Sequence, residues 1–334
     1  MTVVTPPTKA LADGTDLRAS AAELPPFDSQ EVVRHKADAH RTLRDAEGAE
    51  VGRCSLWWQR TPFLPSERLG LIGHYAAASF AASRELLHSA CAELATHGCT
   101  LAVGPMDGST WRRYRWVSDP GGGEVPAFFL EPQNPPAWPA QFTDAGFAPL
   151  AHYCSACTDR LEIEDPKVGR AERRLGGLGI RFRSLDPARW KEELSDVYRL
   201  TTAGFAGSFL YEPLPEAEFL ADYEPLRCLV EPRLVTFAMH GDRAVGFVFC
   251  LPDWQQARRG EPVDTAILKT CAVVPDRAYA GLGSTLVQQT HRAARALGFR
   301  RMIHALMHEA NASLNISARY AKPFRRYTLF AKSL

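Results

Sequence analysis

The sequence predicts an α/β protein with a mixed sheet, organised as two tandem domains that each pack helices against the sheet. The order strand, helix, glycine, strand occurs twice, at 69–103 and at 266–307. The chain has 334 residues, which exceeds what one hydrophobic core usually serves. Its apolar fraction of 46% is ordinary for a globular protein.

The second occurrence is the easier one to interpret. An apolar strand at 266–274 runs into a loop that carries Gly281 and Gly283, and this loop opens a helix. Five apolar residues fall on one face of that helix: Leu282, Leu286, Val287, Ala294 and Leu297. Gly298 stands where a C-terminal cap belongs, and a buried strand follows at 302–307.

The chain before this unit predicts further elements of the same domain. These are a strand at 179–185, a helix at 187–205, a short helix at 215–228, and two hairpin strands at 234–239 and 244–251. Together with 266–274 they make a mixed sheet.

The first occurrence predicts a strand at 69–74, a helix at 83–97 ended by Gly98, and a strand at 99–103. Residues 104–114 are expected to begin a helix, with Asp107, Ser109 or Thr110 as its cap. Residues 128–136 are expected to form a strand that runs into a rigid polar turn, and both segments are candidates for lining a cleft.

Charge and composition exclude several classes of function. The formal net charge is +1 with scattered Lys and Arg, which argues against nucleic acid as a partner. No apolar run is long enough to cross a membrane and no signal pattern is present, so we expect a cytoplasmic protein without a membrane partner.

The eight cysteines lie mostly inside apolar segments, as reduced buried thiols do. Cys154-x-x-Cys157 stands alone without a second pair at zinc spacing, so we expect no metal. Residues 1–28 are rich in Pro, Ala, Thr and Asp, which predicts a flexible tail.

The glycine loop at 277–284 has three interpretations. It can be a tight connection between a strand and a helix, a dinucleotide site, or a coenzyme A site. A dinucleotide fold needs a third glycine where Leu286 stands, and too few residues follow to complete its sheet. A Gly-Lys-Ser/Thr sequence is also missing, which removes the nucleoside triphosphate loop.

The coenzyme A interpretation carries a family resemblance. Cys271-Ala272-Val273-Val274-Pro275 and Ala278-Tyr279-Ala280-Gly281-Leu282-Gly283 resemble the strand end and the Gln/Arg-x-x-Gly-x-Gly/Ala loop of the GNAT acetyltransferase superfamily. Ala278 departs from the usual Gln or Arg, and Arg277 lies one residue early. The resemblance covers about 178–334 and implies acetyl-CoA or another acyl-CoA as cosubstrate. The cofactor residues it implies are Cys271, Ala272, Val273, Arg277, Ala278, Tyr279, Ala280, Gly281, Leu282, Gly283, Ser284, Asn311 and Ser313.

The resemblance also sets the domain boundaries that we expect: a tail at 1–28, a degenerate GNAT-like copy at 29–165, a linker at 166–177 and the acetyl-CoA-binding domain at 178–334. The Gly-Phe turn at 146–147 resembles the one that closes many domains of this family. Residues 75–79, Tyr-Ala-Ala-Ala-Ser, replace the glycine loop in the first copy, so we expect that copy not to bind coenzyme A.

Acetyl transfer to an amine needs a group that takes the amine proton and an acid for the departing thiolate. The cofactor strand offers no carboxylate at 267–270, so Glu309 is the candidate base, with Glu212 as another carboxylate. Tyr320 is the candidate acid, because Ala318 occupies the position of the family's tyrosine, and Tyr327 is a further contender. His304 and His308 are more typical of structural residues, and Cys271 of packing.

The predicted function is N-acyl transfer from acyl-CoA to the amine of a small molecule or amino acid, with Tyr211, Glu212 and Trp111 as substrate-binding candidates. Two alternatives stay open. One is a module that senses acyl-CoA without turnover, and the other is an acyl-CoA hydrolase or decarboxylase that uses the same pocket.

Overall fold

The computed structural model describes residues 24–122 and 125–334. The N-terminal half contains α1 (Gln30–Arg34), β1 (Ala39–Arg44), β2 (Glu50–Trp57), β3 (Leu69–Ala77), α2 (Phe80–Thr96), β4 (Leu101–Gly104), β5 (Trp116–Asp119), α3 (Ala137–Asp144) and β6 (Ala148–Thr158). The mixed α/β architecture predicted from the sequence is confirmed.

Helix α4 (Pro166–Gly177) leads into the C-terminal half. That half contains β7 (Ile180–Ser184), η2 (Pro187–Arg189), α5 (Trp190–Phe205), α6 (Glu216–Tyr223), η3 (Glu224–Leu229), η4 (Pro232–Leu234), β8 (Thr236–His240), β9 (Arg243–Pro252), α7 (Trp254–Arg258), β10 (Thr265–Val273), η5 (Arg277–Tyr279), α8 (Leu282–Ala296), β11 (Arg301–His308), α9 (Ala312–Ser317) and β12 (Lys322–Ser333).

The strands form one 12-stranded sheet in the order β1-β2-β3-β4-β12-β6-β11-β10-β9-β8-β7, with β5 beside β12. The order is mirrored about its centre. In each half an antiparallel strand pair leads to a parallel pair joined through a helix, β3 and β4 through α2, and β10 and β11 through α8.

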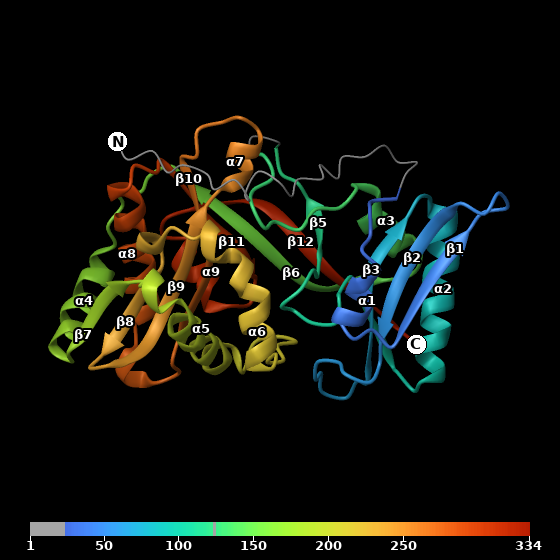
Figure 1. Ribbon diagram of the computed structural model, residues 1–334, viewed down its shortest axis with the longest axis horizontal. Helices are drawn as coiled ribbons and strands as arrows, with labels where there is room; N and C mark the ends of the chain where they lie inside the picture. The colour runs from blue at the N-terminus through green and yellow to red at the C-terminus, as the bar shows by residue number, and fades with distance from the viewer. Residues whose placement is uncertain (1–23, 123–124) are drawn as a thin grey trace.

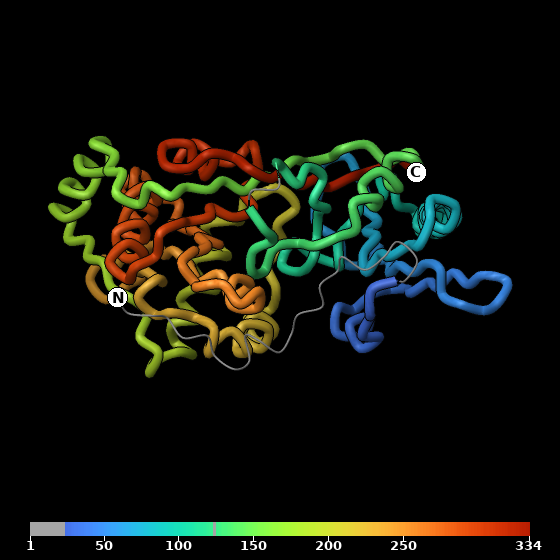
Figure 2. The backbone as a smooth tube through the Cα atoms, turned by 90° about the horizontal axis from the view of Figure 1, so that it is seen from above, coloured from blue at the N-terminus to red at the C-terminus, as the bar shows by residue number. Residues whose placement is uncertain are grey.

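The last strand of each half pairs with the other half. Strand β6 pairs with β11 and β12, and β12 pairs with β4 and β6. Figure 1 shows these two long strands crossing the middle of the molecule, and Figure 2 shows the chain ending in the N-terminal half. The two halves therefore share one hydrogen-bonded sheet.

Helices cover both faces of the C-terminal half. Helix α8 packs on β9 and β10 with α4 behind it, and its predicted apolar residues are buried in the core of this face. Helices α5 and α6 cover the opposite face (Figure 1). In the N-terminal half α2 covers one face, and the other face packs against Leu210 and Phe209 from the C-terminal half.

Two predicted elements are wrong. Residues 104–114 form a turn closed by the bridge Met106↔Tyr114 instead of a helix. Asp107 does not cap a helix, because its Oδ1 accepts a hydrogen bond of 2.6 Å from the backbone N of His74. Residues 128–136 form no strand, because Leu130 has φ +62° and the amide of Phe129 donates to Asp253 at 2.8 Å.

Two segments differ from the expected tail and linker. Residues 1–23 lie outside the described part, but Phe27 stacks on His40 with ring centroids 5.3 Å apart. Residues 166–177 form helix α4, which begins at the cap Asp165 and buries Val168 and Leu175. The boundaries proposed for the two domains stay predictions.

Candidate functional site

The parallel register between β10 and β11 ends early. It runs from Thr265↔Arg301 to Leu268↔His304, although both strands continue beyond these residues. On its other edge β10 stays paired with β9 as far as Val273↔Gly246. Beyond Leu268, the backbone of β10 thus has no strand partner on the side of β11.

The free stretch of β10 leads to the start of α8. Gly281, the N-cap of α8, has φ +83°, a conformation that strains any residue with a Cβ. Among the described residues, the amides of Gly281, Leu282, Gly283 and Ser284 have no hydrogen-bond acceptor. Free amides at a helix N-terminus are a general anion site, because the helix dipole adds to them.

Helix α4 contacts the carbonyl side of the loop. Arg174 donates to the carbonyl oxygen of Ala278 at 2.9 Å and to that of Ala280. In a trans peptide the carbonyl and the next amide point in opposite directions, so the amide of Gly281 points away from Arg174. A Cβ at Gly281 would lie 3.0 Å from the Cβ of Ala171, so this loop also packs closely against α4.

The remaining predicted cofactor residues surround this loop and strand. Cys271 and Val273 lie on the free stretch of β10, and a Cβ at Gly283 would lie 4.0 and 3.9 Å from their side chains. Arg277 and Ala278 are exposed, and Tyr279 Oη lies 3.0 Å from His240 Nδ1. Asn311 caps α9 without a side-chain bond, and Ser313 follows in its first turn.

The two predicted catalytic residues lie in different environments, one buried and one exposed. Tyr320 is 5% exposed in the core beneath α8, and its Oη donates to Gln288 Oε1 at 3.0 Å. Burial raises the pKa of Tyr320 to about 12. Glu309 is exposed, and its nearest cation is Arg326 Nε at 3.9 Å.

The three predicted substrate-binding residues lie together. Trp111 Nε1 donates to the carbonyl oxygen of Glu212 at 2.9 Å, and the rings of Trp111 and Tyr211 are 5.7 Å apart. Trp111 comes from the N-terminal half and the other two from the C-terminal half. This contact therefore joins the halves.

Sequence reasoning missed a lysine where β10 leaves β11. Lys269 is the extra residue of an irregularity in the β9 pairing, between Leu268 and Thr270. Its Nζ donates to the carbonyl oxygen of Leu130 at 2.9 Å. Burial, followed by the charge of Arg115, lowers the pKa of Lys269 to about 7.

A buried polar cluster from both halves lies beside this lysine. Glu131 binds Arg325 Nη1 at 2.6 Å through one carboxylate oxygen and accepts from Tyr327 Oη through the other. Ser155 Oγ lies 3.0 Å from Tyr327 Oη and accepts from the amide of Leu306 at 3.0 Å. The sequence offered one signal, a lysine inside a largely apolar strand. It did not indicate the cluster itself, because the partners of Glu131 are nearly two hundred residues away along the chain.

Strand β11 is also irregular beside this cluster. Leu306 has φ +61°, and the pairing with β6 shifts between His304 and Met307. Arg115 Nη1 donates to the carbonyl oxygen of Leu306 at 3.4 Å. The point where β10 and β11 separate is therefore lined by lysine, arginine, tyrosine and carboxylate groups.

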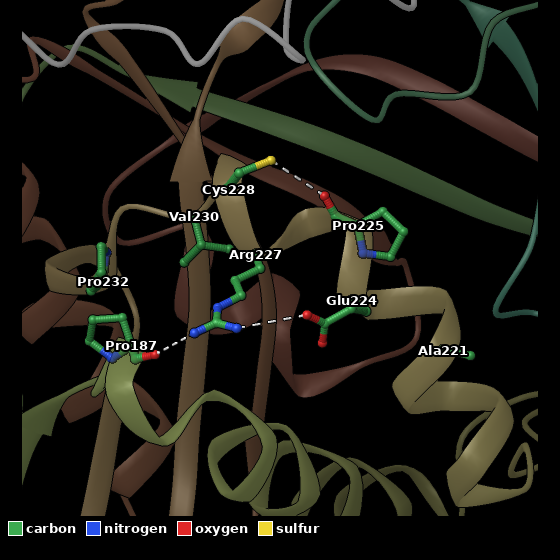
Figure 3. Close-up of a pocket in the computed structure, with 8 residues that line it drawn as sticks. All are labelled: Pro187, Ala221, Glu224, Pro225, Arg227, Cys228, Val230 and Pro232. Atoms are coloured by element: carbon green, nitrogen blue, oxygen red, sulfur yellow. Dashed lines mark hydrogen bonds and ion pairs between the residues drawn. The ribbon is translucent and has the colours of Figure 1, made fainter.

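An open surface groove lies elsewhere, between η2, α6, η3 and η4 (Figure 3). Arg227 donates to the carbonyl oxygen of Pro187 at 3.1 Å there and lies 3.9 Å from Glu224. None of the predicted site residues lines this groove. No helix in the described part of the chain is both long and apolar enough to cross a bilayer.

Comparison with known proteins finds a similarity to the GNAT acetyltransferase family within the C-terminal half of the chain. Residues 194–318 match the sequence model of the Acetyltransferase (GNAT) family. A curated protein of Caulobacter vibrioides, "Bacterial ceramide synthase", is 26% identical over 230 residues, which are 66% of this chain and 58% of that protein. The chain thus spans less than two thirds of this relative.

Solved structures have the same fold at low identity. One is a GCN5-related glucosamine N-acetyltransferase region of a fungal multi-domain β-N-acetylglucosaminidase, with TM-score 0.54, 15% identity, and coverage of 92% of this chain and 35% of that one. Another is a GCN5-related N-acetyltransferase from Anabaena variabilis, with TM-score 0.51, 9% identity, and coverage of 92% and 66%.

Proposed function

We propose that the protein is an acyl-CoA-dependent N-acyltransferase. Two observations together carry the proposal. Strand β10 separates from β11 after Leu268 and His304, and the free stretch of β10 leads to the unpaired amides of residues 281–284. A pantetheine chain can bond to the free edge of β10 while its pyrophosphate binds the amides. The thioester then lies near Lys269, where the strands part.

We further propose that the chain is a tandem repeat whose N-terminal copy does not bind the cofactor. The mirrored strand order supports two copies, with domains at 29–165 and 178–334 that exchange their last strands. The start of α2 differs from that of α8, because Ser79 Oγ accepts from the amide of Ala82 at 3.1 Å. That side chain uses a donor which a phosphate would need.

Lys269 is our choice for the group that takes the amine proton, ahead of Glu309. The amine nitrogen attacks the thioester carbonyl carbon and forms the C–N bond of a tetrahedral intermediate while its proton passes to Lys269 Nζ. The intermediate collapses as the C–S bond breaks, and the thiolate of coenzyme A leaves and takes up a proton from the Lys269 ammonium. With a pKa of about 7, Lys269 holds much of its Nζ as the neutral base at neutral pH. The roles of Tyr320 and Glu309 stay predictions.

The acceptor follows from two considerations. Contacts between the halves at Trp111 and Glu212 favour a small amine held by both. The Caulobacter relative is named a ceramide synthase, and a ceramide is an amide of a long-chain amine, so long-chain amines belong among the acceptors.

Thiol release from acetyl-CoA and longer acyl-CoAs tests the function. We expect release that depends on an added amine, from amino acids, amino sugars and long-chain amines, with one amide formed per thiol. Release without an amine would indicate the hydrolase, and binding without release would indicate the sensor. Either result contradicts the transferase.

A further inference from the structure

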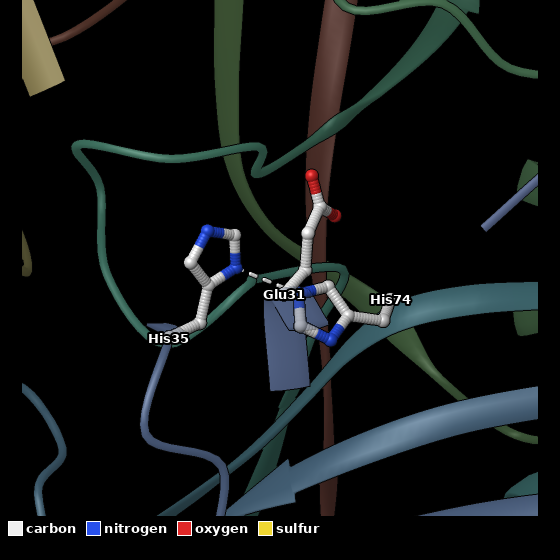
Figure 4. Close-up of side chains that lie close together, drawn as sticks. All are labelled: Glu31, His35 and His74. Atoms are coloured by element: carbon white, nitrogen blue, oxygen red, sulfur yellow. Dashed lines mark hydrogen bonds between the residues drawn. The ribbon is translucent and has the colours of Figure 1, made fainter. Parts of the chain in front are cut away.

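Three potential metal ligands meet in the N-terminal half, far from the cofactor loop in sequence. Glu31, His35 and His74 each offer one ligand atom, and these atoms all lie within 4.8 Å of one another. Figure 4 shows the two imidazole rings facing each other across a hydrogen bond of 2.8 Å between His35 Nδ1 and His74 Nε2. The residues come from α1 and its C-terminal cap and from β3.

Local structure explains why these side chains converge. Glu31 and His35 are four residues apart on one helical turn, a spacing that places two side chains on the same face. His74 has φ +45° within β3, and its amide is held by Asp107 Oδ1. The chain cannot shift easily there, because a Cβ at the preceding Gly73 would lie 2.3 Å from the carbonyl oxygen of Met106.

Both imidazoles are oriented by neighbours. His74 Nδ1 lies 2.9 Å from Ser55 Oγ, which leaves Nε2 as the nitrogen that faces His35. The carbonyl oxygen of His35 accepts from Trp57 Nε1 at 2.9 Å. A buried second carboxylate is close, since Asp107 Oδ2 lies 3.9 Å from His74 Nε2.

We propose that Glu31, His35 and His74 bind one divalent metal ion of the Zn²⁺ type, with the nearby Asp107 carboxylate as a fourth ligand or as the group that orients a bound water. Two imidazoles and a carboxylate are a donor set for Zn²⁺ and similar ions. At metal–ligand distances of about 2.0–2.2 Å, tetrahedral ligands lie roughly 3.3 Å apart. The 2.8 Å ring contact opens slightly and Glu31 moves inward, while the metal replaces the proton shared by the rings.

Two arginines close to the site are already paired with carboxylates. Arg112 is paired with Glu218 at 2.5 Å. Arg34 lies 3.1 Å from Glu31, and metal binding replaces this surface ion pair with a bond from Glu31 to the metal.

Such an ion links α1 to strand β3 of the sheet. The segment after α1 also reaches α6, because Lys36 Nζ donates to Glu218 at 2.6 Å. The metal therefore stabilises the packing of the N-terminal segment on both halves, without taking part in acyl transfer.

Metal content and thermal unfolding test the proposal. Untagged full-length protein is stripped with a chelator, dialysed against Zn²⁺ at neutral pH and assayed for bound zinc. We expect one bound ion and a higher unfolding temperature with Zn²⁺, since a ligand specific to the native state stabilises it. The double variant His35→Gln, His74→Gln loses both effects, and the exposed control His88→Gln keeps them.

Two further measurements test whether the bound ion is held by these histidines. Ser55→Ala, which removes the hydroxyl that lies 2.9 Å from both His74 Nδ1 and His40 Nδ1, weakens the affinity about 10- to 100-fold. Co²⁺ in place of Zn²⁺ gives ligand-field bands without thiolate charge transfer. Equal zinc binding by the wild type and the double variant, both folded by circular dichroism, overturns the proposal, as does a thiolate signature or a wild type that binds no zinc.

Discussion

Leu268 and His304 are the last pair in the parallel register of β10 and β11, and Lys269 follows directly at the point of separation. The opening in the sheet and the base proposed for the chemistry are thus adjacent in sequence. The free edge beyond them leads to the uncapped amides of α8. This relationship gives the proposed reaction its place in the fold.

Replacement of Lys269 by Met removes the proposed base and keeps a long apolar side chain. We expect kcat to fall about 10²- to 10⁴-fold, the usual contribution of general base catalysis. In the wild type the rate rises with pH through about 7, as the ammonium loses its proton. Thiol release from pH 5.5 to 9 measures both effects, and a K269M enzyme with the wild-type rate and pH profile would exclude this role.

Removal of one partner from the buried ion pair of Glu131 and Arg325 is expected to lower stability strongly. Their side chains are 1% and 7% exposed, so removal of one partner leaves a buried charge unpaired. We expect Arg325→Met to lower the free energy of unfolding by about 3–5 kcal/mol. Urea unfolding measures this, with Arg160→Met in the exposed pair with Glu162 as the control; equal small losses in both variants would contradict the assignment.

Ser79 caps α2 in the half proposed not to bind coenzyme A. Loss of its hydrogen bond to the amide of Ala82 in Ser79→Ala should cost about 1 kcal/mol of stability. Acetyl-CoA affinity should not change. A calorimetric titration that finds a changed affinity in this variant would indicate that the cofactor binds at the start of α2, which would contradict our account.

His304 makes stability depend on pH. Burial and then His291 lower its pKa to about 3, whereas the unfolded chain keeps the ordinary value of about 6.5. Below pH 6.5 the unfolded state binds a proton that the native state does not, so stability falls as the pH falls, by about 1.4 kcal/mol per pH unit for this group. Urea unfolding at pH 7 and pH 5 should therefore show a shallower pH dependence in His304→Gln than in the wild type, and parallel curves would contradict the assignment.

Elements with strong local periodicity were predictable from the sequence. Helix α8 was expected because its apolar residues recur on one face, and the structure buries them. The hairpin of β8 and β9 was predicted for similar reasons, as was the strand at 69–74, which in the structure extends to Ala77. Local sequence suffices there because the pattern and the packing agree.

The errors have tertiary causes. Asp107 resembled a helix cap, but its carboxylate binds the backbone of His74 on a neighbouring strand. The pairing of β12 with β6 joins segments far apart in sequence, which no local pattern reports. The cluster around Glu131 and Lys269 was missed for the same reason, since its partners come together only in the folded sheet.

Calorimetric titration with acetyl-CoA tests the central claim most directly. Gly283→Asp adds a negative charge beside the free amides, at a position with room for a Cβ and where an acidic residue suits a helix start. Gly177→Asp adds the same charge at a glycine with no atom within 4 Å of a built Cβ. We predict that the wild type and Gly177→Asp bind alike and that Gly283→Asp binds at least about tenfold more weakly, about 1.4 kcal/mol. A wild type that does not bind, or a Gly283→Asp variant that binds equally well, would contradict the account.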